Sequence, residues 1–221
     1  GSRIGPVGDI GEESHVDIKV SDWLQAADHE VEMRRWRDQS CGRTKEFTVE
    51  CALEGVAPEV IRWYYTNFDD ETYRMWHPAH IGLQWEKKVA GPGAIHIAWE
   101  MIDGKMAAYR IRIDSPDDAP PALAVPPNAT LISILDTEGA PLFHIVTQYS
   151  LTEDGTTKRS RFVVPDAAPD AFCEAHRQHW LEEQPGMAYK AVPHLIRKTF
   201  GRMVEPHVLT AHPLMVPPPL D

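Results

Sequence analysis

The stretch that decides the fold lies toward the C-terminal end, where residues 170–200 are DAFCEAHRQHWLEEQPGMAYKAVPHLIRKTF. Six residues recur at spacings of three and four and therefore share one helix face: Phe172, His176, His179, Glu183, Met187 and Lys190. Phe172 and Met187 mark that face as the inner one. We expect one long helix, capped by Asp166 or Asp170 and kinked at Pro185, whose ring removes a backbone hydrogen bond.

Upstream of that helix, short runs alternate between apolar and polar residues, as strands do. We expect strands at 44–53, 80–85, 94–101, 106–114, 130–135, 142–151 and 158–164. Two helices precede most of them, one over 21–38 with Ser21 or Asp22 as N-cap and one from Pro58 to Phe68. This order predicts an α+β fold, in which a curved antiparallel sheet grips the long helix and encloses a cavity.

The domain organisation predicted is simple. We expect residues 1–16 to be a tag or disordered, residues 17–204 to form a single helix-grip domain, and residues 205–221 to form a Pro-rich tail. Residues 115–128 contain five prolines and little periodicity, so they form a loop whose length suggests a lid or a pocket rim.

Composition excludes several classes of function. The formal net charge is −11 and no basic stripe is present, which argues against a nucleic-acid partner. Three cysteines without CxxC spacing argue against disulfides and a cysteine-rich metal site. No apolar stretch is long enough to span a bilayer, so we expect a cytoplasmic protein without a membrane partner. A homodimer is compatible with the sequence.

Histidine and glutamate residues occupy positions where they can meet inside the fold. On the long helix, His179 and Glu183 are four residues apart and can bind one metal ion, since a buried carboxylate is costly unless it is paired or metal-bound. On the sheet, His80 shares a strand face with Gly82 and Gln84, and Glu100 shares one with His96 and two alanines. Strand faces of this kind can line a water-filled cavity, although alternation alone favours an ordinary solvent-exposed face.

Two histidines and two glutamates would form a site of two nitrogen and two oxygen ligands. That ligand set suits Zn²⁺ best, with Mn²⁺ and Fe²⁺ as weaker candidates. We therefore expect zinc as the cofactor.

Four blocks of sequence resemble one enzyme family. They are GVAPEVIRWYY at 55–65, YRMWHPAH at 73–80, KRSRF at 158–162 and HWLEE at 179–183. In this order they are similar to the 2,4-diacetylphloroglucinol hydrolases and phloretin hydrolases, over about residues 45–200. The resemblance implies a Bet v 1-like helix-grip fold with a zinc ion in its cavity.

The resemblance also implies particular residues for the site. The metal ligands would be His179 and Glu183 on the helix and His80 and Glu100 on the sheet, acting on the substrate through the water that the metal activates. His77 and His176 are alternates. We prefer His80 to His77, because His77 precedes Pro78 in a loop, whereas His80 begins a strand.

Substrate contacts are expected from the cavity wall. Family members place a substrate-binding histidine on the strand before the KRSRF block, where this chain has Gln148, with His144 on the same strand face. Tyr73, His144 and Gln148 are the candidates to hold the phenolic oxygens. A core or strand role is an equal alternative for each of them.

The reaction implied is hydrolysis of the carbon–carbon bond between an acyl group and a phloroglucinol-like ring. Water attacks the acyl carbonyl, and the ring leaves as an enolate after a ring carbon has been protonated. Two other functions remain open on the same scaffold. One is a cyclase or aldol-type enzyme acting on a polyketide, and the other is a non-catalytic carrier of hydrophobic ligands.

Overall fold

The computed structural model describes residues 18–126 and 128–201. The predictions for residues 1–16 and 205–221 lie outside these described residues. Helices are α1 (Val20–Ser40), α2 (Pro58–Asn67), α3 (Asp70–Arg74), α4 (Asp170–Gly186) and α5 (Val192–Phe200), with a 3-10 turn at Pro116–Asp118 and a π-helical segment at Met187–Ala191.

Seven antiparallel strands form one sheet. They are β1 (Thr44–Glu54), β2 (His80–Lys87), β3 (Ile95–Ile102), β4 (Lys105–Asp114), β5 (Ala129–Leu135), β6 (Pro141–Leu151) and β7 (Gly155–Pro165). Their order across the sheet is β1-β7-β6-β5-β4-β3-β2, so strands consecutive in sequence pair throughout except β1 and β2, and β7 pairs with β1. The strand series expected from the sequence is confirmed, with ends shifted by at most a few residues.

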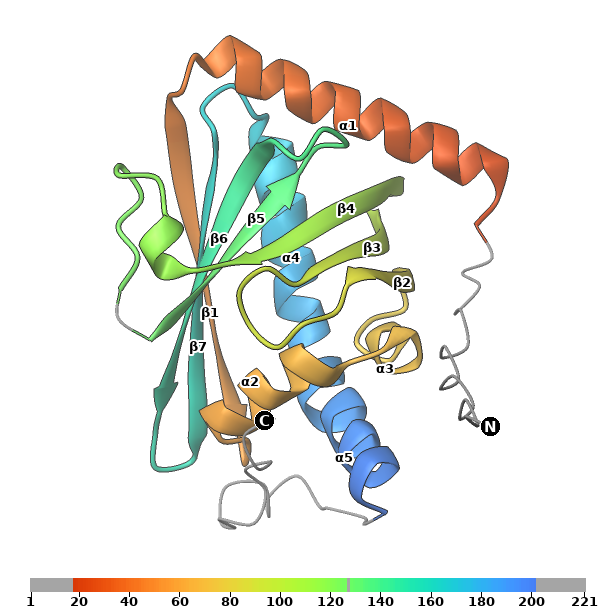
Figure 1. The fold of residues 1–221 in the computed structure, drawn as a ribbon, viewed down its shortest axis with the longest axis vertical. Coiled ribbons are helices and arrows are strands. Elements are labelled where there is room, and N and C mark those ends of the chain that lie inside the picture. Colours follow the sequence, from red (N-terminus) through yellow and green to blue (C-terminus); the bar gives the residue numbers. More distant parts are fainter. Residues whose placement is uncertain (1–17, 127, 202–221) are drawn as a thin grey trace, which may run out of the picture.

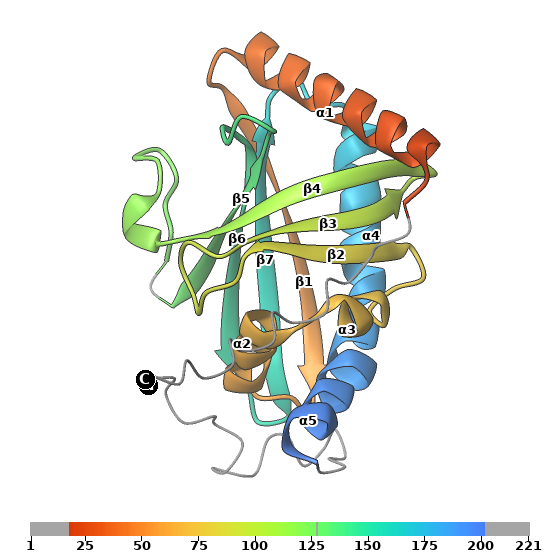
Figure 2. The same ribbon diagram turned by 45° about the vertical axis from the view of Figure 1, so that its right-hand side comes forward.

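The sheet curves around α4, which runs along its inner side (Figure 1). Helices α2 and α3 connect β1 to β2, the two edges of the sheet, and both lie close to α5 (Figure 2). Helix α1 crosses the opposite end, over β4. The predicted α+β helix-grip fold is thus confirmed.

Buried aromatic rings fill the space where α2, α3 and the sheet meet. Tyr64, Phe68 and Trp76 are all at most 8% exposed and pack with ring centroids 5.7–5.8 Å apart. Elsewhere on the sheet, Phe47 of β1 stacks on Phe162 of β7, with ring centroids 4.6 Å apart. Aromatic pairs at these distances stabilise the fold beyond the effect of the surface area that each ring buries.

Helix ends differ from the sequence predictions. Lys19 precedes α1 as its N-cap, while Asp22 accepts a hydrogen bond from the Lys19 amide. Pro169 caps α4, which makes Asp170 the first helical residue. The chain remains helical through Pro185, and a π-helical segment begins at Met187, two residues later.

The Pro-rich loop lies mainly on the outer face of the sheet. Leu123 is buried against Leu131, Val146 and Val163, which point away from α4. In the described part of the loop, only Pro116 lines the cavity between sheet and helix. The expectation of a lid or rim therefore applies to the start of the loop, because the rest finds an apolar surface on the outside.

All three cysteines are free, as expected. None of the helices within 18–126 and 128–201 has the length and apolar character needed to cross a membrane.

Candidate metal centre and cavity

The β2–β3 hairpin places two candidate ligands side by side. His80 at the start of β2 pairs directly with Glu100 of β3, and opposite residues in an antiparallel pair have neighbouring side chains. A register shift follows between His80 and Gly82. The bulge reverses the alternation, so Leu83 is buried while Gln84 is exposed. The prediction that His80, Gly82 and Gln84 share one strand face is therefore wrong, because Gly82 and Gln84 do not lie on the face of His80.

Helix α4 brings the other two candidates. His179 and Glu183 lie one turn apart on its buried face. Close approach of α4 to the turn before β2 depends on Gly186, because a Cβ there would lie 1.8 Å from the Trp76 carbonyl oxygen. Glycine thus lets the helix backbone touch the loop that carries His80.

Four side chains from the hairpin and the helix converge. His80 Nε2 lies 3.1 Å from His179 Nε2 and 3.2 Å from Glu183 Oε2. His179 Nε2 lies 3.6 Å from Glu100 Oε2 and 3.7 Å from Glu183 Oε2. Ligand atoms of His80, Glu100 and His179 all fall within 4.8 Å of one another; Glu183 is outside this group of three but adjacent to both histidines.

The cluster fits a small divalent cation. Tetrahedral zinc with bonds of about 2.0–2.2 Å separates its ligand atoms by about 3.3–3.6 Å, and the four separations that involve the histidine Nε2 atoms given above are 3.1–3.7 Å. Imidazole and carboxylate are ligands that zinc prefers. Glu183 is not in the group of three that contains Glu100. It can bind as a fourth ligand or leave the fourth position to water.

Neighbouring groups orient the ligands. His80 Nδ1 donates to the Tyr73 carbonyl at 3.1 Å, so in the neutral ring the lone pair is on Nε2, which faces the cluster. The Tyr73 ring stacks on His80 with centroids 4.2 Å apart, and its hydroxyl donates to Glu100. Tyr73 therefore fixes one ligand from each strand of the hairpin.

The charges of the cluster depend on one another. Burial opposes the protonated form of His80, but the hydrogen bond with Glu183 and the nearby carboxylates outweigh it and raise the His80 pKa. Burial likewise opposes the ionised form of Glu183, but the hydrogen bond and charge of His80, with His179 and Lys158, lower the Glu183 pKa. The buried carboxylate of Glu183 and the partly buried one of Glu100, beside two imidazoles, thus attract positive charge, either a proton or a metal ion.

A buried lysine is linked to Glu183 by hydrogen bonds through Gln184. Lys158 of β7 is 1% exposed and donates to Gln184 Oε1 at 2.8 Å and to Tyr65 Oη at 2.9 Å. Gln184 in turn donates to Glu183 Oε1 at 2.9 Å. Burial lowers the Lys158 pKa to about 8, while the Glu183 charge opposes that shift. The ammonium group also lies 4.2 Å from the Trp180 ring centroid, a cation–π contact.

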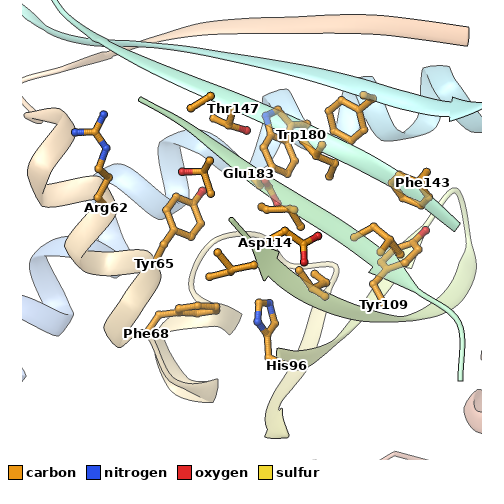
Figure 3. A pocket seen from close by; sticks show the side chains of 18 of the residues that line it. Arg62, Tyr65, Phe68, His96, Tyr109, Asp114, Phe143, Thr147, Trp180 and Glu183 are labelled. Carbon is orange, nitrogen blue, oxygen red and sulfur yellow. The ribbon is translucent and has the colours of Figure 1, made fainter. Parts of the chain in front are cut away.

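A cavity of about 320 Å³ opens beside the cluster (Figure 3). Glu100, His179 and Glu183 line it directly, together with Tyr73. Most of the remaining wall is aliphatic or aromatic, contributed by residues that include Phe68, Tyr109, Ile111, Ile132, Phe143 and Trp180. Such a chamber suits a flat, largely apolar molecule with a few polar groups.

Tyr109 and His176 form a polar pair in that wall. His176 Nδ1 donates to the Phe172 carbonyl at 2.8 Å, so its Nε2 accepts from the Tyr109 hydroxyl, also at 2.8 Å. His29 of α1 lies on the other side of Tyr109, with Nε2 3.2 Å from the hydroxyl oxygen. Burial lowers the His176 pKa to about 3 and raises the Tyr109 pKa, so both groups are neutral near pH 7.

The alternate metal ligands lie outside the cluster. His77 Nδ1 accepts from the Ala79 amide, and its Nε2 is 3.4 Å from Glu182 at the surface. His176 is engaged with Tyr109. Of the two histidines weighed for the sheet position, the structure brings His80 to the cluster.

Two predicted substrate contacts are displaced from the cavity. His144 and Gln148 belong to β6, whose cavity-lining residues are Phe143, Ile145, Thr147 and Tyr149. His144 instead lies 2.9 Å from Ser133 Oγ, on the outer side of the sheet. The error has a physical cause: the Pro-rich loop covers that outer side at Val146, so both faces of β6 carry apolar residues and alternation cannot distinguish them.

Several features of the site are not evident from the sequence. Lys158 belongs to the KRSRF block, but nothing local indicates that this lysine is buried. The sequence places His96 on the strand face of Glu100, but it assigns no role to His96 or to Tyr109, both of which line the cavity. Gly186 had a signal, since a glycine after Pro185 inside a helical pattern indicates close packing.

Comparisons with known proteins are limited to distant likenesses. No protein-family model matches the chain, and no curated protein matches it significantly. Similar solved structures include Ara h 8.0201 (18% identity, 71% of this chain and 99% of that chain, TM-score 0.46). A START superfamily protein from Mycobacterium smegmatis is similar as well (15% identity, 66% and 94% coverage, TM-score 0.43). A protein of unknown function from Staphylococcus aureus is another (12% identity, 72% and 99% coverage, TM-score 0.40). Likeness at these levels says nothing about activity.

Proposed function

We propose that this protein is a zinc-dependent hydrolase that cleaves the carbon–carbon bond between an acyl group and a phenolic ring. The observation that carries the proposal is the convergence of His80, Glu100, His179 and Glu183 at the wall of an apolar cavity. A divalent ion bound there supplies a Lewis acid that polarises a carbonyl oxygen and lowers the pKa of water.

Residues of the chain would perform the remaining tasks. The aromatic and aliphatic wall orients a planar ring and excludes water, which strengthens the charge interactions inside. Tyr109 keeps its proton near neutral pH and donates it to His176, so the Tyr109 oxygen can accept a hydrogen bond from a phenolic hydroxyl. Tyr73 keeps Glu100 and His80 in place beside the acyl group.

A hydroxylated ring is required by the chemistry. An ortho hydroxyl allows the ring to tautomerise, so that the bond to the acyl carbon breaks with an enolate as leaving group. Acyl benzenes without such hydroxyls should therefore be inert. Simple esters should be poorer substrates than acylphloroglucinols, because their leaving groups do not use the cavity wall.

Metal content of the purified full-length chain is the first test. We expect about one zinc per chain, retained in His77→Ala and lost in His80→Ala and Glu183→Ala. His77→Ala is the matched control, because His77 belongs to the same turn but points to Glu182. Zinc-free wild-type protein from a zinc-supplemented culture would overturn the proposal.

Product analysis in ¹⁸O-labelled water is the second test. Hydrolysis of an acylphloroglucinol should place the label in the carboxylic acid and not in the phenol, and a chelator should stop the reaction. Rearrangement of a polyketide without label would favour the cyclase or aldol-type function. Binding of acylphloroglucinols and polyketides without turnover would favour a carrier, a function that a largely apolar cavity also suits.

A further inference from the structure

Cationic and phenolic side chains gather in the part of the cavity wall that α2 and β6 contribute. Arg62 and Tyr65 of α2 and Tyr149 of β6 all line the cavity, and each is partly exposed. Figure 3 shows Arg62 and Tyr65 at one end of the cavity, with Tyr109 and Phe143 at the other. The proposed hydrolysis assigns no task to the three residues at the α2 end.

The Arg62 guanidinium is held beside Tyr149 without a hydrogen-bond acceptor. It lies 5.6 Å from the centroid of the Tyr149 ring, a cation–π contact. Its ion pair with Glu59, at 3.9 Å, joins side chains that are 41% and 59% exposed, so solvent screens it and it contributes little. Within the described residues the guanidinium makes no hydrogen bond, so its fork of N–H donors is available to an anion.

The two tyrosine hydroxyls are also donors without acceptors. Tyr65 Oη accepts from Lys158 at 2.9 Å, so its own proton remains for another group. In the described part of the chain, no side chain accepts from Tyr65, and the Tyr149 hydroxyl makes no hydrogen bond. Burial raises the pKa of both phenols, and the nearby Tyr149 raises the Tyr65 pKa further, whereas the Arg62 charge opposes the shift at Tyr149. Both hydroxyls therefore keep their protons near pH 7.

Positive charge lies on both sides of these hydroxyls. Arg62 is over the Tyr149 ring, and Lys158 donates to Tyr65. Burial lowers the Lys158 pKa to about 8, so the ammonium form still predominates at pH 7. Because hydrogen bonds in a chain polarise one another, donation from an ammonium group makes the Tyr65 hydroxyl a stronger donor.

The acidic side chains of the cavity wall do not accept from these donors. Glu100 and Glu183 belong to the metal cluster. Asp114 accepts from Ser133 and from Arg112. Among the described residues, the α2 end of the cavity thus presents donors and positive charge without a protein acceptor.

We propose that Arg62, Tyr65 and Tyr149 form a subsite for the anionic group of an organic acid, whose apolar body lies along the aromatic and aliphatic wall of the cavity. The guanidinium and the two hydroxyls donate to the carboxylate or sulfonate oxygens, and the apolar wall covers the rest of the molecule. The subsite requires no metal ion. It therefore goes beyond the proposed function and applies to a hydrolase and to a carrier alike.

A matched pair of fluorescent probes tests the subsite on the full-length chain. 8-Anilinonaphthalene-1-sulfonate and N-phenyl-1-naphthylamine have the same rings, and only the first carries an anion. Wild-type protein should bind the sulfonate about tenfold more tightly, because its charge-assisted hydrogen bonds outweigh the cost of removing it from water. Arg62→Gln should lose this preference, and Tyr149→Phe should reduce it to about threefold.

Arg43→Gln is the matched control. It removes the same charge from an arginine that is 68% exposed and does not line the cavity, so it should keep the tenfold preference. Thermal melts report whether each variant folds, and the affinity for the neutral probe reports whether the cavity is intact. The preference should be the same with zinc and with a chelator, because none of the three subsite residues belongs to the metal cluster.

The outcomes separate the subsite from the proposed function. Equal binding of the two probes by wild type, binding of neither, a preference that persists in Arg62→Gln, or a preference that appears only with zinc would overturn the subsite. A preference in the chelated chain, together with no zinc binding, would support the subsite and contradict only the proposed function.

Discussion

At the scale of single residues, Tyr73 connects the parts of the candidate site. It was expected to hold a phenolic oxygen of the substrate, but its hydroxyl donates to Glu100 while its ring and carbonyl contact His80. One side chain thus restrains ligands on both strands of the β2–β3 hairpin. Groups of this kind set the orientation of metal ligands and affect metal affinity.

Replacing Tyr73 by phenylalanine should therefore weaken zinc binding without unfolding the protein. The ring still stacks on His80, but Glu100 loses its hydrogen-bond donor, and we expect a loss of about 10–100-fold in zinc affinity. Competition with a chromophoric chelator measures the change. Tyr149→Phe is the control, since Tyr149 also lines the cavity but lies away from the cluster. Equal zinc affinities for both variants would contradict the assigned role of Tyr73.

Asp136 is a second residue whose role can be tested, this time through pH. Its side chain is buried and accepts from the Ala140 amide and from Arg37, with Arg34 3.7 Å away. Burial opposes the ionised form, but these partners outweigh it and lower the Asp136 pKa. Stability from the carboxylate is therefore present above about pH 4 and is lost as the pH falls through the lowered pKa.

Asp136→Asn should be less stable than wild type by on the order of 2 kcal/mol at pH 7, because the charged hydrogen bonds to α1 disappear. The difference should shrink steadily below about pH 4, as the wild-type carboxylate is protonated. Urea unfolding at a series of pH values measures it. A difference that stayed constant down to pH 2 would rule out the charge as its source.

At the scale of elements, the contact between α4 and the turn before β2 decides whether the four ligands can meet. Gly186 provides this contact, because the Trp76 carbonyl occupies the space that a Cβ would need. Helix α4 then presents His179 and Glu183 to the first residue of β2. The ion pairs of Arg34 and Arg37 with Asp136 attach α1 to the opposite end of the sheet.

Gly186→Ala should push α4 away from the Trp76 turn. The overlap at 1.8 Å cannot be relieved by a side-chain rotation, since both atoms belong to or adjoin the backbone. We expect a destabilisation of about 1–3 kcal/mol or more, together with weaker zinc binding. Thermal denaturation and metal titration measure the two effects. Leu181→Ala, on the exposed side of α4, should change neither, and a silent Gly186→Ala would show that the approach is looser than described.

At the scale of the whole molecule, the candidate centre joins the sheet to the helix that the sheet surrounds. Its ligands come from β2, β3 and α4. Strands β4 to β7 lie between Glu100 and His179 in the sequence. A metal ion bound to all of them would stabilise the folded state and not the unfolded chain, where the ligands are far apart.

Zinc should consequently raise the melting temperature. At a free zinc concentration 100 times the dissociation constant the gain is about 2.7 kcal/mol, or roughly 5–10 °C for a chain of this size. Differential scanning fluorimetry with and without a chelator measures it. His80→Ala should melt at the same temperature in both conditions, while His77→Ala should respond as wild type does. No shift in wild type at saturating zinc would count against the centre.

The sequence alone determined the secondary structure, the helix-grip fold and the helix pair His179 and Glu183. These follow from local rules, because side chains three or four apart share a helix face and alternate ones share a strand face. His80 was preferred to His77 because it begins a strand, and it is the one of the two that lies in the cluster.

Only the tertiary structure decided which strand faces meet the cavity and which residues support the ligands. The bulge after His80 moved Gln84 outward, and the loop over β6 left His144 and Gln148 outside. The burial of Lys158 and the unpartnered Nδ1 of His96 depend on what the rest of the chain packs against them. Such environments arise from contacts between residues distant in sequence, so no pattern of neighbouring residues encodes them.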